Sequence, residues 1–94
     1  MDISVVVPLY NEEDNVQLLY EEIKGVLDTM PEQAEIVVVD DGSRDNTLAK
    51  LEAIQAGDDH VRVVRFRRNF GQTAAMTAGF DHARGGVIIT MDGD

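Results

Sequence analysis

The sequence has 94 residues and a formal net charge of -10, with 44% hydrophobic and 28% charged residues. This length allows one small domain, and the balance of apolar and charged residues is that of a globular chain rather than a disordered one. The negative charge argues against nonspecific binding to nucleic acid or to anionic lipid, because both are themselves negative. The absence of cysteine excludes a disulfide framework, a thiolate metal site and a cysteine nucleophile.

Seven elements alternate along the chain. Continuous aliphatic runs predict strands, and apolar residues at three- and four-residue spacing predict helices. Asp14 is the expected N-cap of the first helix, and Asp45 or Ser43 that of the second. Met76 and Phe80 in the third helix are expected to pack in the core. In chain order, strands are predicted over residues 3–9, 35–39, 61–66 and 86–91, and helices within residues 11–30, 43–57 and 71–83.

The alternation of strands and helices predicts an α/β fold with a Rossmann-like parallel sheet and right-handed crossovers. The first, second and fourth strands are unbroken aliphatic runs, as in strands covered on both faces. The third strand carries Arg62 and Arg65, so we place it at an edge. The expected strand order is 3-2-1-4, with helices flanking the sheet. Open α/β sheets bind ligands where the winding direction reverses, which here is between the first and fourth strands.

Acidic residues follow two of the buried strands. Asp40 and Asp41 follow the second strand, and Asp92, Gly93 and Asp94 follow the fourth. Residues two apart in an extended chain face the same side, and a glycine between them lets a ligand approach closely. Two such carboxylates suit Mg²⁺ or Mn²⁺ that also binds phosphate oxygens, although a solvated acidic turn is the alternative.

The ends of the first two strands supply further candidate binding residues. An acid that closes the second strand of an α/β nucleotide site accepts hydrogen bonds from a base or ribose, which is the functional interpretation of Asp40. A turn-forming acid before Gly42 is the alternative, and Asp41 is interpreted as a local turn residue. Tyr10 either packs on a base or shapes its turn, and Glu12 also suits the first turn of a helix.

Two familiar phosphate-binding motifs are absent. The sequence contains neither G-x-G-x-x-G nor G-x-x-x-x-G-K-[ST], so a backbone cradle for phosphate is excluded and a metal ion must take its place. Arg65, Arg67 and Arg68 form a basic cluster after the third strand. This cluster either meets phosphate or pairs with the surplus of surface acids.

Four segments together resemble a known family. "SVVVPLYNEEDNV", "EIVVVDDGSRDNT", "RRNFGQTAAMTAG" and the terminal "MDGD" occur in the order and spacing of the N-terminal, nucleotide-binding half of family 2 glycosyltransferases with the GT-A fold. The resemblance covers all 94 residues. It is greatest to the branch typified by dolichyl-phosphate mannose synthase, which transfers a sugar to polyprenyl phosphate.

The resemblance implies a donor site and a reaction. The donor would be a UDP- or GDP-sugar, the cofactor Mg²⁺ or Mn²⁺, and the acceptor a lipid phosphate at the cytoplasmic face of a membrane. No nucleic acid is expected as a partner. Asp92 and Asp94 would bind the metal, with Asp94 as the more direct ligand. The implied nucleotide-sugar-binding residues are Pro8, Tyr10, Glu12, Val39, Asp40, Asp92, Gly93 and Asp94.

Residues 1–94 are expected to form the nucleotide-sugar-binding half of a longer glycosyltransferase domain, cut at the D-x-D motif. Because the acceptor-side residues of the family would follow Asp94, we expect no turnover by these residues alone. A receiver-type phosphoacceptor domain is the alternative function. An assembly-prone fragment is a further alternative, since the aliphatic edge of the last strand could pair with a second copy.

Overall fold

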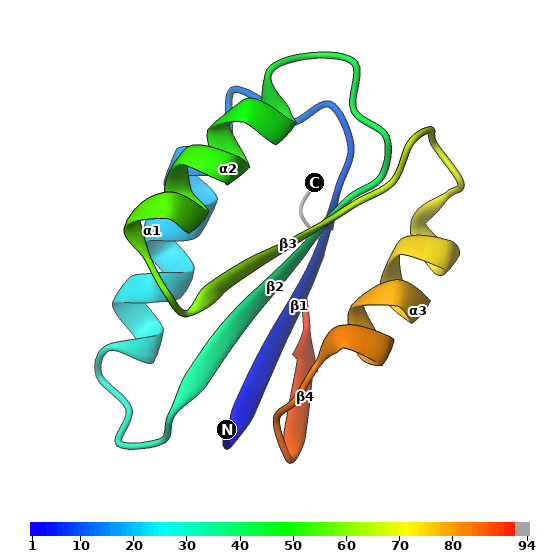
Figure 1. Cartoon of the computed structure of the whole chain (residues 1–94). Helices are drawn as coiled ribbons and strands as arrows, with labels where there is room; N and C mark the ends of the chain where they lie inside the picture. Colours follow the sequence, from blue (N-terminus) through cyan, green and yellow to red (C-terminus); the bar gives the residue numbers. More distant parts are fainter. Residues whose placement is uncertain (92–94) are drawn as a thin grey trace.

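The structure is a computed structural model, and it describes residues 1–91. A four-stranded parallel sheet in the order β3-β2-β1-β4 has α1 and α2 on one face and α3 on the other (Figure 1). This arrangement confirms the predicted fold class and strand order. The elements are β1 (Ile3–Leu9), α1 (Val16–Leu27), β2 (Ala34–Asp40), α2 (Thr47–Gly57), β3 (Val61–Arg65), α3 (Gln72–His82) and β4 (Val87–Thr90).

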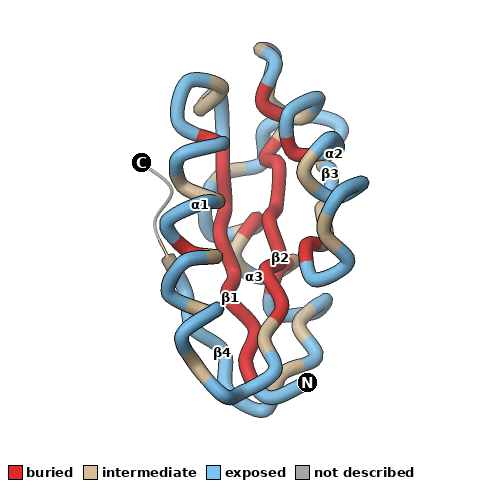
Figure 2. The backbone as a smooth tube through the Cα atoms, turned by 90° about the vertical axis from the view of Figure 1, so that its left-hand side faces the viewer, coloured by how far each residue is buried: buried red, intermediate tan, exposed pale blue. Residues whose placement is uncertain are grey.

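The two central strands form the core of the molecule. Every residue of β1 is buried, and so is every residue of β2 after the first (Figure 2). Alternate residues of β1 and β2 join the apolar cluster beneath α1 and α2, and the others lie under α3. A Cβ on Gly79 would overlap the side chain of Val6, so the glycine lets α3 approach β1 closely.

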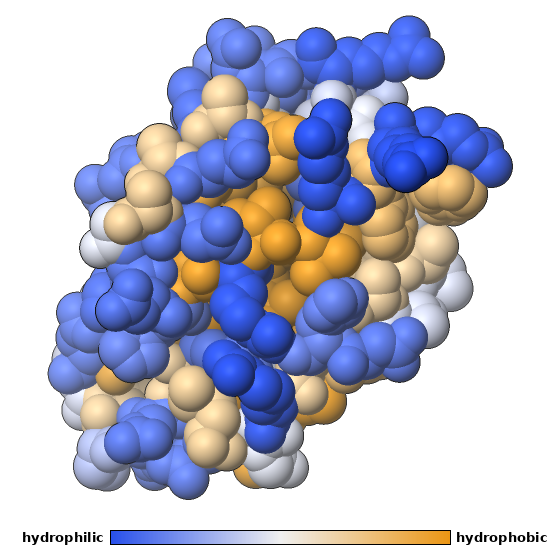
Figure 3. Space-filling model, viewed as in Figure 1, coloured by the Kyte–Doolittle hydropathy of each residue, from blue (hydrophilic) through white to orange (hydrophobic). Residues whose placement is uncertain are grey.

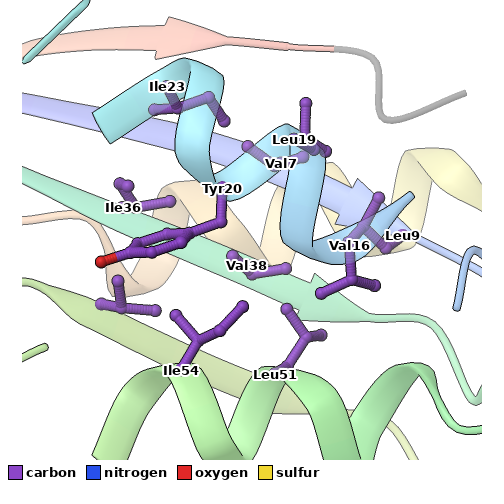
Figure 4. A pocket seen from close by; sticks show the side chains of 11 residues that line it. Val7, Leu9, Val16, Leu19, Tyr20, Ile23, Ile36, Val38, Leu51 and Ile54 are labelled. Carbon is purple, nitrogen blue, oxygen red and sulfur yellow. The ribbon is translucent and has the colours of Figure 1, made fainter. Parts of the chain in front are cut away.

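A small cavity lies in the core between α1, α2 and the sheet (Figure 4). Its volume is about 20 Å³ and its lining is aliphatic apart from Tyr20. The Tyr20 hydroxyl donates to Asp58 Oδ2 at 2.6 Å, and this hydrogen bond raises the pKa of Tyr20 to about 12. A void of this size and lining is a packing feature of the core, not a ligand site.

Two expectations about burial are wrong. Val87, Ile88 and Ile89 of β4 are 57%, 41% and 41% exposed, because within residues 1–91 β4 has a neighbour only on the β1 side. Phe80 is 44% exposed, because α3 faces the sheet with its small residues Ala75 and Gly79, and Phe80 lies on another side of the helix. Met76 is half-buried. Self-association through the β4 edge stays a prediction.

Both N-caps differ from the predicted residues, which were Asp14 for α1 and Asp45 or Ser43 for α2. The N-cap of α1 is Asn15 rather than Asp14, and that of α2 is Asn46. Asp45 nevertheless accepts the Thr47 amide at 2.9 Å, so it satisfies one of the free amides at the start of α2. None of the helices within residues 1–91 has the length and apolar character needed to cross a membrane.

A buried carboxylate holds the amino end of the sheet together. Glu35 on β2 is 1% exposed and accepts hydrogen bonds from Ser4 Oγ at 2.6 Å, the Arg84 amide at 2.7 Å and Arg62 Nε at 3.1 Å. Burial alone would raise the pKa of Glu35, but these hydrogen bonds and the two arginine charges hold it below its usual value. Because Gly85 N–H also donates to Ser4 Oγ at 2.8 Å, the cluster fixes the chain entering β4.

Candidate functional site

Three loops gather at the carboxyl end of the sheet. They connect β1 to α1, β2 to α2 and β3 to α3, and Figure 1 shows all three at the top of the molecule. We call these loops, with the strand ends that precede them, the carboxyl rim. Its members are residues 8–15, 39–46 and 65–71.

The first two loops of the carboxyl rim are joined by hydrogen bonds. Asn11 N–H donates to Ser43 Oγ at 2.9 Å, and Arg44 N–H donates to Asn11 Oδ1 at 2.8 Å. Asn11 has φ 51°, a left-handed conformation that asparagine tolerates better than most residues. Glu12 N–H donates to Thr47 Oγ1 at 2.9 Å. The segment that carries Glu12 is therefore held against the start of α2.

The structure brings five of the eight predicted binding residues to neighbouring strand ends. In the register of β1 and β2, Pro8 is opposite Val39 and Leu9 is opposite Asp40. Tyr10 follows directly and is 39% exposed. The five are Pro8, Tyr10, Glu12, Val39 and Asp40.

Three predicted residues, Asp92, Gly93 and Asp94, lie outside the residues that the structure describes. Their convergence with Asp40 and Glu12 stays a prediction. The preceding residue, Met91, donates its amide to Val6 O at 3.0 Å, which continues the pairing of β4 with β1.

Asp40 is a buried carboxylate with few partners. It is 1% exposed, and among residues 1–91 the only hydrogen bond to its carboxylate comes from Ser43 N–H at 3.3 Å. Its backbone oxygen accepts the Phe66 amide at 2.9 Å, which ties β2 to the end of β3. An ionised carboxylate has about four acceptor positions, so most of the capacity of Asp40 is left for a ligand.

Asp41 anchors the third loop of the carboxyl rim. It is 4% exposed, and its carboxylate accepts the Phe70 amide at 2.8 Å, Asn69 Nδ2 at 3.0 Å and the Gly71 amide at 3.1 Å. These partners are 28 to 30 residues away in sequence, so the interpretation of Asp41 as a local turn residue is wrong. Asp41 instead fixes the β3–α3 loop next to Asp40.

Gly42 allows the second and third loops to touch. Its φ is +74°, in the region that favours glycine, and a Cβ there would overlap the backbone of Arg68 and Asn69. No other residue type fits this position without moving the β3–α3 loop. Because Gly42 and Asp41 act on the same loop, the "DDG" segment determines the position of the arginine cluster.

The arginine cluster is not neutralised by the neighbouring surface. Arg65, Arg67 and Arg68 are exposed. The ion pairs found among residues 1–91 involve none of these three arginines. Pairing with surface acids is therefore wrong as an explanation of the cluster within this part of the chain.

The metal prediction depends on residues beyond the described part. Within residues 1–91, no three histidine, aspartate or glutamate side chains gather as a metal-binding group. The buried Asp40 offers a carboxylate at the carboxyl rim with spare acceptor capacity, and carboxylate oxygens suit hard divalent cations. Asp92 and Asp94 would have to supply the remaining protein ligands.

Comparison with known sequences identifies a family and its members. Residues 4–94 match the family described as "Glycosyl transferase family 2". The chain is 45% identical to the dodecaprenyl-phosphate galacturonate synthase of Rhizobium johnstonii, over 100% of the chain and 28% of that protein. It is 44% identical to an undecaprenyl-phosphate 4-deoxy-4-formamido-L-arabinose transferase of Shewanella sediminis, over 98% of the chain and 28% of that protein.

Solved structures share the fold. S. aureus TarS (residues 1–349) in complex with UDP has a TM-score of 0.79 and 28% identity, over 100% of the chain and 28% of that structure. The mannosyltransferase PcManGT from Pyrobaculum calidifontis, in complex with GDP-Man and Mn²⁺, has a TM-score of 0.78 and 26% identity, over 98% of the chain and 27% of that structure. The chain thus spans less than a third of these proteins, in the N-terminal part of the GT-A fold. It belongs to glycosyltransferase family 2.

Proposed function

We propose that this chain binds the nucleotide-sugar donor of a glycosyltransferase that moves a sugar from a UDP- or GDP-sugar to a polyprenyl phosphate. The observation that carries the proposal is Asp40, a buried carboxylate at the end of a central strand with a single 3.3 Å hydrogen bond among residues 1–91. Burying a carboxylate with so few partners is costly. A ligand that donates hydrogen bonds to Asp40 would offset that cost.

The predicted binding residues at the carboxyl rim have separate roles in this proposal. Asp40 accepts hydrogen bonds from the base or the ribose of the donor. Tyr10, 39% exposed, packs its ring on the base. Pro8 and Val39, opposite one another in the register, are buried and support the ends of β1 and β2, which carry Tyr10 and Asp40. The loops need little rearrangement on binding, because hydrogen bonds already join them.

A divalent cation fits the chemistry of the proposed donor. Mg²⁺ or Mn²⁺, held by Asp94 and Asp92, would stabilise the negative charge that develops on the departing diphosphate. The Mn²⁺ and GDP-Man complex of the related mannosyltransferase supports this part of the proposal. Within this chain, Glu12 and Asp40 orient the nucleoside.

The proposed acceptor comes from the relatives, and the proposed location follows from that acceptor. Two relatives more than 40% identical are named for transfer to dodecaprenyl and undecaprenyl phosphate. A polyprenyl chain is confined to a bilayer by its apolar length. We therefore propose that the whole enzyme works at the cytoplasmic face of a membrane.

Nucleotide binding is the direct test. The melting temperature of the 94-residue chain is measured with UDP, GDP, CDP and TDP, each with and without Mn²⁺. We expect UDP or GDP with Mn²⁺ to raise the melting temperature more than nucleotide or metal alone, because binding to the folded state stabilises it. CDP and TDP serve as controls for nonspecific binding of a diphosphate.

Two outcomes would contradict the proposal. One is the absence of any shift with every combination of nucleotide and metal. The other is a shift of equal size in an Asp40→Asn variant, which keeps the shape of the side chain and the acceptor for Ser43 but removes the charge. The Asp59→Asn variant, at an exposed position near the amino end of β3, is the matched control.

A further inference from the structure

The charges of this chain are strongly segregated. Residues 60–80 contain no aspartate or glutamate, although the sequence has 18 such residues. Four of its eight basic residues fall between positions 62 and 68. Three of these four, Arg65, Arg67 and Arg68, are exposed and make no ion pair within residues 1–91. A locally positive surface therefore stands on a molecule whose net charge is -10.

An exposed aromatic ring belongs to the same surface. Phe70 is 53% exposed, and the Arg68 guanidinium lies 4.1 Å from the centre of its ring. Figure 3 shows strongly hydrophilic side chains at the upper right, over the β3–α3 loop, with hydrophobic side chains beside them. We call residues 65–70 the arginine–aromatic loop.

The arginine–aromatic loop is held in place. Asp41 accepts the Phe70 amide at 2.8 Å, and the backbone of Gly42 lies directly against Arg68. The rings of Phe66 and Phe70 meet edge to face at 5.5 Å. A loop held at these points loses little conformational entropy when it meets a partner.

The neighbouring helix extends this surface without adding charge. A groove along the outer side of α3 is lined by uncharged residues, among them Met76 and Phe80. Phe80 is 44% exposed and Met76 half-buried. Arginines beside exposed aromatic rings and an uncharged helix face are the composition of surfaces that lie in the interface of a bilayer.

The chemistry of the loop favours an anionic lipid surface. A guanidinium donates two parallel hydrogen bonds to the oxygens of one phosphate. An aromatic ring is stable at the boundary between headgroups and acyl chains. The net charge disfavours nonspecific contact, but charges of exposed groups are screened beyond about 8 Å at physiological salt. The exposed arginines would therefore meet the headgroups while Glu21 and Glu22 of α1, on the opposite face of the sheet from α3, remain at a distance.

We propose that the arginine–aromatic loop docks on the anionic headgroups of a phospholipid bilayer, with Phe70 entering the interface. This contact places the β3–α3 loop, on one side of the carboxyl rim, nearest to the membrane. The inference rests on the proposed function in one respect, since an enzyme that uses a polyprenyl phosphate acceptor must reach it at a bilayer.

The test is sedimentation of the 94-residue chain with vesicles. One set contains phosphatidylcholine and phosphatidylglycerol in equal amounts, and the other phosphatidylcholine alone. We expect partitioning onto the anionic vesicles only, weakening as salt is added. An Arg67→Gln/Arg68→Gln variant should bind about 25-fold less, because each basic residue near an anionic surface contributes a factor of about five. Phe70→Ser should weaken binding as well.

The matched control removes the same charge elsewhere. A Lys24→Gln/Lys50→Gln variant changes the half-buried Lys24 on α1 and the exposed Lys50 on α2, and it should keep the affinity for anionic vesicles. Equal losses in the two double variants would overturn the inference, because the binding would then depend on overall charge. Unchanged binding by Arg67→Gln/Arg68→Gln would overturn it too.

Measuring the effect of nucleotide on the melting temperature of the same variants distinguishes this inference from the proposed function. The Arg67→Gln/Arg68→Gln variant should keep the rise in melting temperature that UDP or GDP with Mn²⁺ produces. If that rise disappears and no form of the chain binds vesicles, the arginines serve the donor phosphates and the lipid contact is wrong. If vesicles bind but no nucleotide stabilises the chain, the lipid contact stands and the proposed donor site fails.

Discussion

The two ends of β2 each carry a buried carboxylate, and the two differ in their partners. Glu35 and Asp40 are each 1% exposed. Glu35 accepts hydrogen bonds from one serine and two arginines, at distances from 2.6 to 3.4 Å. Asp40 has one hydrogen bond to its carboxylate within residues 1–91, at 3.3 Å.

The difference separates a structural role from a binding role. A buried charge is tolerated when its hydrogen bonds and ionic partners compensate for lost hydration. The fold supplies those partners to Glu35 and leaves Asp40 with acceptor capacity. Burial alone does not distinguish the two residues, whereas the count of donors does. We therefore expect changes at Glu35 to alter stability and changes at Asp40 to alter ligand binding.

The largest effect is expected at Glu35. Glu35→Ala should lower the free energy of unfolding by about 3 kcal/mol, because it leaves the donors of Ser4 and Arg62 without their acceptor. Urea denaturation measures the change. Glu32→Ala, at an exposed position shortly before β2, is the control and should be nearly neutral. A loss of nucleotide affinity in Glu35→Ala at a temperature where it is folded would contradict the purely structural role assigned to Glu35.

A smaller effect, of a different kind, is expected at Asp40. Asp40→Asn should weaken binding of UDP or GDP with Mn²⁺ by about 2 kcal/mol, or about thirtyfold, because hydrogen bonds to the charged carboxylate become hydrogen bonds to a neutral amide. The free energy of unfolding should change little. Isothermal titration calorimetry measures the affinity, and equal affinities for the variant and the unchanged chain would rule out the role assigned to Asp40.

Asp41 lies beside Asp40 but resembles Glu35 in its partners. Asp41→Asn should lower the free energy of unfolding by about 1.5 kcal/mol, since an amide side chain has one acceptor oxygen for the three donors. Hydrogen exchange should quicken at the amides of Phe70 and Gly71 and stay unchanged in β1. Unchanged exchange at Phe70 and Gly71 would show that Asp41 does not hold the β3–α3 loop.

The pH dependence of stability tests whether the charge of Glu35 stabilises the fold. The pKa of Glu35 is lowered in the folded state, so its contribution is complete above the unfolded value of about 4.3 and is lost as the pH falls through the folded value. We expect the stability difference between the unchanged chain and Glu35→Gln to shrink on acidification over that range. A difference that is constant with pH, measured by urea denaturation, would mean that the charge of Glu35 contributes nothing.

The strand order was predictable because it depends on local patterns. Aliphatic runs of strand length, alternating with helical spacing, leave few topologies for a right-handed parallel sheet. The arginines of β3 marked it as an edge strand, and β3 is at the edge. The ends of β1 and β2 then had to be neighbours, which is why five predicted binding residues lie together at the carboxyl rim.

Long-range polar contacts were not predictable. In the sequence, Glu35 is a single polar residue at the start of an aliphatic strand. Its partners Arg62 and Arg84 are 27 and 49 residues further along the chain. Asp41 was indistinguishable from an ordinary turn residue until the β3–α3 loop folded over it. In each case the crossovers of the chain bring the carboxylate and its hydrogen-bond donors together, and this pairing leaves no periodic pattern in the sequence.

Local sequence patterns are enough to specify the elements of this chain, the parallel sheet and the end of the sheet at which acidic residues gather. Hydrophobic periodicity and the rule that parallel strands end at one edge carry that information. Within residues 1–91, the hydrogen-bond partners of the buried carboxylates and the lack of ion pairs at the arginine cluster depend instead on tertiary packing. Those outcomes depend on distances of a few ångströms between distant segments, and packing rather than local propensity sets such distances.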